Sequence, residues 1–406
     1  MTHEAVVADE AAGLRDKVVD ALVADGTISS PAIEAAMRKI PRHEFAPEAS
    51  LETAYEPYAA VITKTDEHGV QLSSVSAPQI QALMLEQAKI APGARVLEIG
   101  SGGLNAAYLA ELVGEHGEVV TVDIDPDVTA RARRLLDEHG YGRVHVVTAD
   151  AAEPVPGLGQ VDVVLVTVGA WDIPPAWISQ LKPDGRLVVP LRMRGLTRSV
   201  AFVREGEHLV SESAKVCGFV PMQGAASHQE ENWLVAGTQE VALRFDDGGP
   251  SDPALLDNAV TTPRAELWSG AEVAAGELID TLQMHLAIAL PGFCTMTVDP
   301  ALDTGIVAPS NKSFSMAAVD GTDFAYLVTR RTPEQRFEYG VHAFGPTAPA
   351  FAETVAGHLR DWARLHRGGP GPVIRVYPAH TPDAQVPGDR VIDKVHSRVS
   401  LSWPAA

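Results

Sequence analysis

The feature that most constrains the fold is a regular alternation of apolar runs and helical stretches between residues 94 and 191. The apolar runs are rich in Val, Ile and Leu and read ARVLEIG, GEVVTVD, GRVHVVTAD, VDVVLVTV and GRLVVPL. Helical patterns separate them, from about Leu104 to Val113, Pro126 to His139 and Pro174 to Leu181. Strands that alternate with helices predict a parallel sheet covered on both faces. We therefore expect a doubly wound α/β fold, with Asp125 and Pro126 starting the second helix.

The segments on either side of this alternation follow other patterns. From Ala11 to Ile40 apolar residues at helical spacing predict two short helices, followed by loops and short strands as far as Ser76. Beyond Gly224 the alternation stops, and short mixed segments are separated by Gly and Pro at DDGGPSDP, LPGF, FGPTAP and RGGPGP. We expect a helical N-terminal cap with loops over residues 1–76, an α/β core over 77–224 and an α+β extension over 225–406.

Composition and charge exclude several classes of protein. The formal net charge of −21 repels polyphosphate and anionic membranes, so neither nucleic acid nor a membrane is expected as a partner. No stretch approaches about 18 uninterrupted apolar residues, and two cysteines, Cys217 and Cys294, are too few for a disulfide framework. The 14 histidines show no metal-ligand spacing, so we expect no metal. A reducing cytoplasm is the compartment that fits this pattern.

The strongest functional signal is VLEIGSGG, a buried strand that runs into a glycine-rich turn and then a helix. Glycines let backbone amides approach a ligand above a helix N-terminus, but nucleotide, dinucleotide and S-adenosylmethionine sites all use such turns. Asn105 stands where a dinucleotide fingerprint has its third glycine, and no P-loop Lys follows. Asp123 ends the next strand, where a carboxylate accepts ribose hydroxyls. Asp150 ends the third, where a side chain can face an adenine.

With these motifs, the sequence resembles the protein-L-isoaspartate O-methyltransferases. VLEIGSGG, VDIDP, TAD and IPPAWISQLKPDGRLVVPL carry the resemblance, and AMRKIPRHEFAP, SVSAPQIQALM and GFVPMQG extend it from about Arg15 to Gly224. It implies a Rossmann-like methyltransferase core that binds S-adenosyl-L-methionine. The residues that it places around this cofactor are Glu98, Gly100, Ser101, Gly102, Asp123, Ile124, Asp150, Ala151 and Thr167.

Residues 225–406 are expected to have no counterpart in the repair enzymes of this family. The whole chain instead resembles the two-domain methyltransferases of FxLD-type lanthipeptide gene clusters, through WSG, PGFC, EYGVHAFG and KVHSRVSLSW. That resemblance implies methylation of an aspartate in a ribosomally made peptide, whose ester closes to succinimide and opens to isoaspartate. The peptide precursor would be the partner of the enzyme, and the extension would recognise it. The oligomeric state is not predicted.

The acceptor side of the predicted site departs from the repair enzymes. The turn GSGGLN is one residue shorter than the family's G-x-G-S-G-Y type, and VITKTDEHGVQLSSVSAP is longer and lacks the family's LPIG-type wording. An altered acceptor follows as a hypothesis. The resemblance makes Ser76 the active-site residue, and we expect Ser74, Val75 and Ser76 to bind the acceptor. Trp171 follows the end of the fourth strand, so we expect it to line the acceptor mouth.

Each acceptor assignment has a structural alternative. Ser76 followed by Gln79 is also a capping box for a helix that begins at Ala77. Trp171 is equally well explained as an aromatic core residue. An acceptor carboxylate is already ionised at neutral pH, so orientation rather than a general base is expected to dominate catalysis.

Three other functions compete with peptide aspartate methylation. General repair of isoaspartyl residues is the activity of the parent family, a cofactor-binding scaffold is a non-enzymatic reading, and an NAD-dependent oxidoreductase is disfavoured by Asn105. Basic residues near the C-terminus are either a solvated face or a peptide-docking surface. They are Arg360, Arg364, Arg367, Arg375, Arg390, Lys394 and Arg398.

Overall fold

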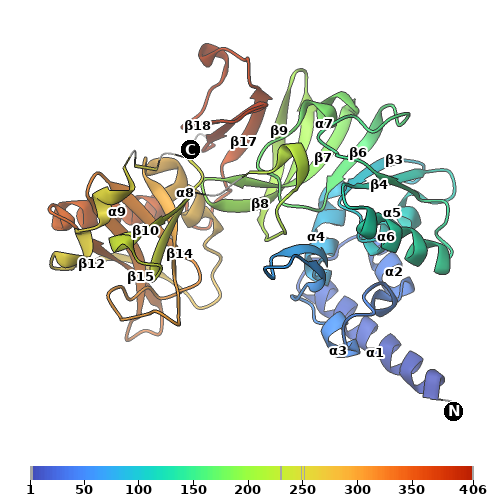
Figure 1. Ribbon diagram of the computed structural model, residues 1–406, viewed down its shortest axis with the longest axis horizontal. Helices are drawn as coiled ribbons and strands as arrows, with labels where there is room; N and C mark the ends of the chain where they lie inside the picture. Colours follow the sequence, from blue (N-terminus) through green and yellow to red (C-terminus); the bar gives the residue numbers. More distant parts are fainter. Residues whose placement is uncertain (1–2, 229–230, 248, 251, 405–406) are drawn as a thin grey trace.

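A computed structural model describes residues 3–228, 231–247, 249–250 and 252–404. The helices are α1 His3–Ala24, α2 Pro31–Lys39, α3 Leu51–Ala54, α4 Pro78–Ala88, α5 Leu104–Val113, α6 Pro126–Glu138, α7 Pro175–Ser179, α8 Asp280–Ala289 and α9 Ala348–Leu365. Short 3₁₀ turns are η1 Arg42–Phe45, η2 Gly224–Ala226, η3 Val235–Gly237, η4 Pro253–Leu256, η5 Ala259–Thr261 and η6 Asp383–Gln385. Figure 1 shows how these elements are arranged.

The strands form a hairpin and two large sheets. The hairpin is β1 Val61–Thr65 and β2 Gln71–Val75. The first large sheet has ten strands in the order β18-β19-β17-β9-β8-β7-β6-β3-β4-β5. Its members are β3 Arg95–Ile99, β4 Glu118–Asp123, β5 His145–Thr148, β6 Val161–Val166, β7 Leu181–Met193, β8 Leu196–Glu205, β9 His208–Val216, β17 Val373–Pro378, β18 Arg390–Asp393 and β19 Ser397–Ser402.

The α/β alternation expected from the sequence is confirmed in the first part of this sheet. Strands β5, β4, β3, β6 and β7 are parallel to one another, and the order reverses direction between β3 and β6. Alternate residues of one strand enter different apolar clusters: Val96 packs with helices α1, α2, α4 and α5, whereas Leu97 packs with Trp177 of α7. Both faces are therefore covered, as the apolar runs predict. Asp125 caps α6 by accepting from the amide of Asp127.

The second large sheet is antiparallel and belongs to the C-terminal half. Its order is β10-β11-β13-β14-β15-β16-β12. The strands are β10 Glu231–Leu234, β11 Val241–Phe245, β12 Ala265–Val273, β13 Phe293–Val298, β14 Ser315–Asp320, β15 Asp323–Arg331 and β16 Phe337–Phe344. Helices α8 and α9 pack on one face and the turns η3 to η5 on the other. This is the expected α+β extension.

The last three strands of the chain lie in the first sheet rather than the second. Strand β17 pairs with β9 through Arg375 and Val210, and β19 and β18 continue beyond it. In Figure 1 these red strands stand beside β9, between the core and the seven-stranded sheet. The sheet of the core thus runs across the boundary expected near residue 224, because β9 offers an edge that a distant segment fills. The three-part division of the chain stays a prediction.

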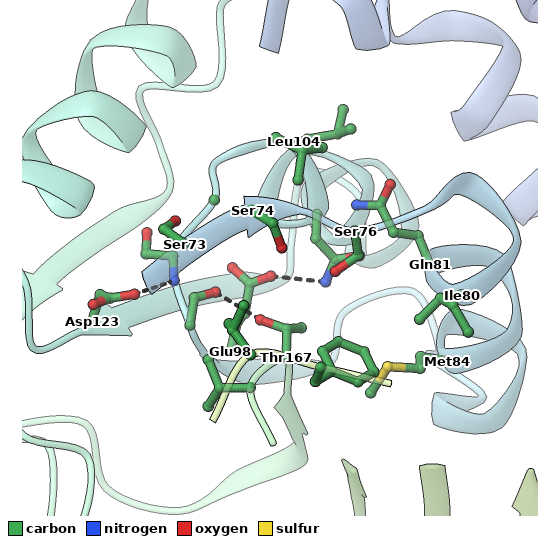
Figure 2. Close-up of a pocket in the computed structure, with 18 of the residues that line it drawn as sticks. Ser73, Ser74, Ser76, Ile80, Gln81, Met84, Glu98, Leu104, Asp123 and Thr167 are labelled. Atoms are coloured by element: carbon green, nitrogen blue, oxygen red, sulfur yellow. Dashed lines mark hydrogen bonds between the residues drawn. The ribbon is translucent and has the colours of Figure 1, made fainter. Parts of the chain in front are cut away.

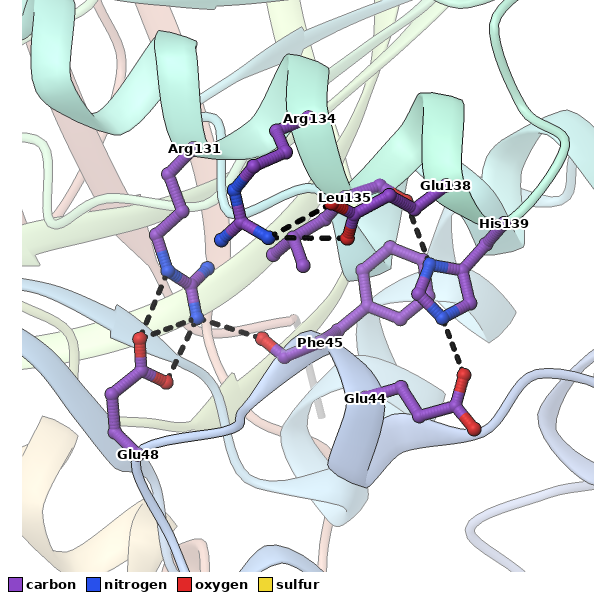
Figure 3. A network of polar contacts seen from close by, with 8 residues as sticks. All are labelled: Glu44, Phe45, Glu48, Arg131, Arg134, Leu135, Glu138 and His139. Carbon is purple, nitrogen blue, oxygen red and sulfur yellow. Dashed lines mark hydrogen bonds and ion pairs between the residues drawn. The ribbon is translucent and has the colours of Figure 1, made fainter.

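The N-terminal cap is held to the core through helix α6, as Figure 3 shows. Arg131 donates to both carboxylate oxygens of Glu48 and to the carbonyl of Phe45. His139 Nδ1 donates to Leu135 O at 2.7 Å, and His139 Nε2 lies 2.5 Å from Glu44 Oε2. The first helix is longer than expected, extending from His3 to Ala24.

Candidate functional site

A pocket opens at the carboxyl ends of the parallel strands, on the side where the strand order reverses. Ligands bind at such switch points in open α/β sheets. The pocket is bounded by the glycine turn after β3, by the end of β4, by the residues after β6 and by strand β2. Of the residues expected at the site, its lining contains Ser74, Val75, Ser76, Glu98, Gly100, Ser101, Gly102, Asp123 and Thr167. Figure 2 shows the serines of β2 on one side, with Glu98 and Thr167 facing them.

The two glycines of the turn have different structural roles. Gly100 has a φ of +100°, and an added Cβ would lie 2.6 Å from Thr167 Oγ1. The Thr167 hydroxyl occupies that space because it donates to the carbonyls of Ile99 and Gly100. At Gly102 a Cβ would meet only the carbonyl oxygen of Ser74, at 3.8 Å. Gly100 is thus required by the backbone, and Gly102 borders the acceptor side of the pocket.

Glu98 is a buried carboxylate at the floor of the pocket. Its oxygens accept from Asn105 Nδ2 at 2.8 Å and from Thr121 Oγ1 at 2.6 Å. Burial raises the pKa of Glu98 to about 7, despite the two hydrogen bonds. Asn105, which argues against a dinucleotide fingerprint, therefore has a defined structural task here: its amide orients Glu98.

Asp123 and Ser101 have the unused hydrogen-bonding capacity that a cofactor needs. Each Asp123 oxygen accepts one backbone amide, from Ser101 and from Asp125, which leaves further lone pairs. Burial raises the pKa of this carboxyl group. The Ser101 hydroxyl is buried and has no hydrogen-bond partner among the described residues. A buried polar atom without a partner calls for a ligand or water, so these residues fit a bound nucleoside.

The remaining predicted cofactor residues lie in an adjoining cavity. Ile124, Asp150 and Ala151 line it, and it shares Gly100 and Asp123 with the first pocket. The two cavities therefore form one groove along the strand ends. Asp150 is less available than expected, because its oxygens accept from the backbone amides of Ala152 and Ala225.

The capping-box interpretation of Ser76 is wrong. Helix α4 begins at Pro78 with Ala77 as its N-cap, and no side chain caps it. The amide of Gln79, which a capping box would use, donates instead to the carbonyl of Pro57. Proline at the first helical position has no N–H that a cap would have to satisfy, which explains why the helix begins at Pro78 without a side-chain cap. The Ser76 hydroxyl has no partner in the described protein and borders the pocket.

Two residues that shape the acceptor side were missed from the sequence. Arg42 is buried in the N-terminal cap and donates to Gln81 Oε1 at 2.6 Å and to Val75 O at 3.5 Å, so it holds the strand that carries the serines. Burial lowers the pKa of Arg42 to about 10. Phe219 lines the pocket opposite β2. The family motifs PRHEF and GFVPMQG contain these residues and were the available signal.

Trp171 lies outside this pocket. Its ring stacks on His228, with centroids 3.8 Å apart, and the Lys394 ammonium lies 4.1 Å from the ring centroid. Lys394 also donates to the carbonyls of Trp171 and Arg192. Trp171 lines a second cavity between the two halves of the chain. The structure therefore does not bring it together with Ser74 and Ser76.

Hairpin β1–β2, in which the sequence predicts a departure from the repair enzymes, borders both cavities. Leu72 of β2 lines each of them. Lys64 of β1 fastens the hairpin to the start of α6, with its ammonium 2.6 Å from Asp125 Oδ2 and 2.8 Å from Asp127 Oδ2. The hairpin thus forms one wall of the groove.

Several of the basic residues near the C-terminus are paired with acids of the same region. Arg360 pairs with Glu353, Arg364 with Asp361 and Arg367 with Glu277. Arg398 pairs with Asp383 and Asp393. Such pairs favour the solvated-face interpretation over a docking surface.

The fold and the groove define the chain as a Rossmann-like methyltransferase that uses S-adenosylmethionine. The sequence profile of "Protein-L-isoaspartate(D-aspartate) O-methyltransferase (PCMT)" matches residues 14–227. The protein-L-isoaspartate O-methyltransferase of Methanopyrus kandleri is 36% identical over 220 residues, covering 53% of this chain and 94% of that protein. That of Hyperthermus butylicus is 37% identical over 227 residues, covering 53% and 91%. The chain belongs to the protein-L-isoaspartate O-methyltransferase family and is a carboxyl methyltransferase that acts on peptide or protein substrates.

A solved structure corrects the expectation about the extension. A chain described as a protein-L-isoaspartate O-methyltransferase aligns over 96% of this chain and 100% of its own length, with 21% identity and a TM-score of 0.50. The fold of residues 225–406 therefore does have a counterpart in a protein of that description. Among the described residues, no helix has the length and apolarity to cross a membrane.

Proposed function

We propose that this enzyme methylates the free carboxylate of isoaspartyl residues in peptides and proteins. The observation that carries the proposal is the position of Ser76, which lines the same pocket as Asp123 and the buried, unpartnered hydroxyl of Ser101. S-adenosylmethionine, when bound, supplies an electrophilic methyl group on a sulfonium. Gly100, Ser101 and Asp123 are the residues that would hold it, with Asp150 beside them in the adjoining cavity.

The acceptor side suits a reaction in which an anion loses its charge. Its polar side chains are neutral, and apolar side chains such as Ile80, Met84 and Phe219 line the rest. The neutral polar residues are Ser73, Ser74, Ser76 and Gln81. No Lys or Arg occurs among the described residues that line the pocket. Neutral hydroxyls orient the carboxylate without a strong ion pair, which would stabilise the ground state more than the transition state. Positioning a carboxylate oxygen in line with the methyl group can supply roughly 7–11 kcal/mol.

A second candidate is methylation of an aspartate in a ribosomally made lanthipeptide, leading through succinimide to isoaspartate. Two observations favour it: the sequence resemblance over both halves, and the altered hairpin β1–β2 that walls the groove. The parent activity is better supported by the relatives, so we place the lanthipeptide second.

One experiment separates the two candidates. The enzyme is incubated with S-adenosylmethionine and three substrates: a generic isoaspartyl peptide, its aspartyl twin, and a lanthipeptide before and after macrocyclisation. A one-methyl mass gain on the isoaspartyl peptide alone supports the first candidate. A transient one-methyl gain followed by loss of methanol, which leaves the peptide one water lighter than at the start, on the cyclised lanthipeptide alone, supports the second and refutes the first.

A further inference from the structure

A cavity of about 600 Å³ lies between the two halves of the chain, next to the methylation pocket. Its walls come from the segment after β6, the β7–β8 turn and the segment after β9 on the core side. The C-terminal half contributes Arg244 of β11, Gln283 of α8 and Phe314. The volume falls in the range of pockets that enclose a ligand, roughly 300–1,000 Å³.

The lining of this cavity is basic in a strongly acidic protein. It includes Arg192, Arg198, Arg244 and His228, and no Asp or Glu occurs among its described lining residues. The chain as a whole carries a formal net charge of −21. Arg192 is balanced by Asp246, a buried carboxylate 2.6 Å away.

Arg198 has a buried cation whose hydrogen-bond acceptors among the described residues are neutral. The residue is 3% exposed. Its Nη1 donates to the carbonyl of Thr197 at 3.0 Å, and its Nη2 donates to Gln283 Oε1 at 2.6 Å. Burial lowers the pKa of Arg198, with Asp280 as the acid that opposes the shift. A guanidinium has five N–H donors and matches a carboxylate in two-point contact, so Arg198 has capacity for an anion.

The cavity adjoins the acceptor side of the methylation pocket. Phe219 lines both, and Gly218, Pro221 and Met222 of the same segment line the cavity. This segment is fixed by backbone hydrogen bonds, from Gly169 N to Val220 O at 2.7 Å and from Met222 N to Gly169 O at 2.9 Å. A peptide whose acceptor residue enters the pocket beside Phe219 would have neighbouring residues within reach of the cavity, because an extended chain advances about 3.3 Å per residue.

We propose that this cavity binds an acidic side chain of the substrate peptide, close in sequence to the methylated residue, through Arg198. The inference rests on the proposed function in that it assumes a peptide acceptor. The C-terminal half thereby becomes a determinant of substrate choice, since Gln283 orients the guanidinium. The neutral acceptor pocket binds the reacting carboxylate weakly, whereas the basic cavity binds a second, acidic side chain of the peptide.

The test is a scan of isoaspartyl peptides that carry a single Glu, or a matched Gln, at one to four positions on either side of the isoaspartate. At one or two adjacent positions, we expect the Glu peptide to have a KM about tenfold lower than its Gln twin, with kcat unchanged. Arg198→Gln should remove the difference by raising the KM of the Glu peptide to about that of its Gln twin. Arg198→Lys should retain part of it. Arg364→Gln on the exposed face of α9 is the matched control and should keep the wild-type preference.

Two outcomes overturn the inference. The first is a wild-type enzyme that shows no preference for Glu over Gln at any position. This result refutes the inference even if Arg198→Gln does not fold, because it needs no variant. A preference that survives in a folded Arg198→Gln enzyme would do so as well. If no isoaspartyl peptide is methylated, the proposed function fails, and calorimetric binding of the same peptides at saturating S-adenosylhomocysteine decides the inference: equal affinity for Glu and Gln peptides refutes it.

Discussion

Replacing Gly100 by alanine should destabilise the enzyme much more than the same change at Gly102. At Gly100 the new residue would be held at a φ of +100°, which costs an L residue roughly 1–2 kcal/mol. Its Cβ would also lie 2.6 Å from Thr167 Oγ1 and 3.0 Å from Val168 Cγ1. Moving the Thr167 hydroxyl sacrifices a hydrogen bond worth about 1 kcal/mol. The expected loss of unfolding free energy is about 2–3 kcal/mol.

The assay is thermal unfolding of both variants without ligand. A loss of this size lowers Tm by about 5–12 °C for a cooperative unit of roughly 150–250 residues. Gly102→Ala, whose Cβ meets only Ser74 O at 3.8 Å, should change Tm by less than about 2 °C. The affinity of Gly100→Ala for S-adenosylhomocysteine should fall too, because the turn borders Asp123. Equal Tm losses at the two glycines would refute this account of the turn.

Three further predictions concern single side chains. Ser76→Ala should leave Tm unchanged, because the hydroxyl caps no helix, but it should lower kcat/KM for an isoaspartyl peptide by about 10–100-fold. A lower Tm with normal kinetics would instead indicate that the hydroxyl caps the helix. Burial raises the pKa of Glu98 from 4.5 to about 7, so the folded protein binds this proton more tightly than the unfolded chain does. The free energy of unfolding therefore falls as the pH rises from 4.5 to 7. Glu98→Gln should remove this pH dependence of the unfolding free energy, which amounts to at most about 3 kcal/mol. If the difference in Tm between wild type and variant is the same at pH 5 and pH 8, the prediction is wrong. Asp172→Ala should lower Tm by several degrees, since it leaves the His396 amide and the Ser397 hydroxyl without their acceptor, at about 1–3 kcal/mol each; calorimetry showing no change would exclude the contact.

The sequence predicts the parallel part of the core sheet closely because its signals are local. The β-branched runs and the Asp125–Pro126 helix start need only neighbouring residues to be read, and β3, β4, β6, α5 and α6 lie where they are expected. Cofactor residues such as Asp123 follow, because strand ends in a parallel sheet converge on one edge. Strand β17 illustrates the opposite case: its pairing with β9 joins segments that are distant in sequence, and no periodicity encodes it.

The acceptor side was predicted less well for two physical reasons. Ser76 and Gln79 fit a capping pattern, but Pro78 starts the helix and Pro57 takes the amide that a cap would use. Trp171 follows the fourth parallel strand, yet its ring stacks on His228 and contacts the Lys394 ammonium, in the cavity between the two halves of the chain. Neither the uncapped helix start nor the position of Trp171 can be predicted from the sequence without knowing which distant segments approach the site.

The pairing of β17 with β9 also constrains how the protein is made. Roughly 150 residues separate the two strands, and at a synthesis rate of about 5–20 residues per second β17 emerges about 10–30 s after β9. During that interval the growing chain carries the parallel core with an open hydrogen-bonding edge at Leu209 and Val210. The nascent polypeptide is therefore most vulnerable to aggregation after its methyltransferase core has been translated, and a slow codon stretch between the two strands would lengthen that exposure.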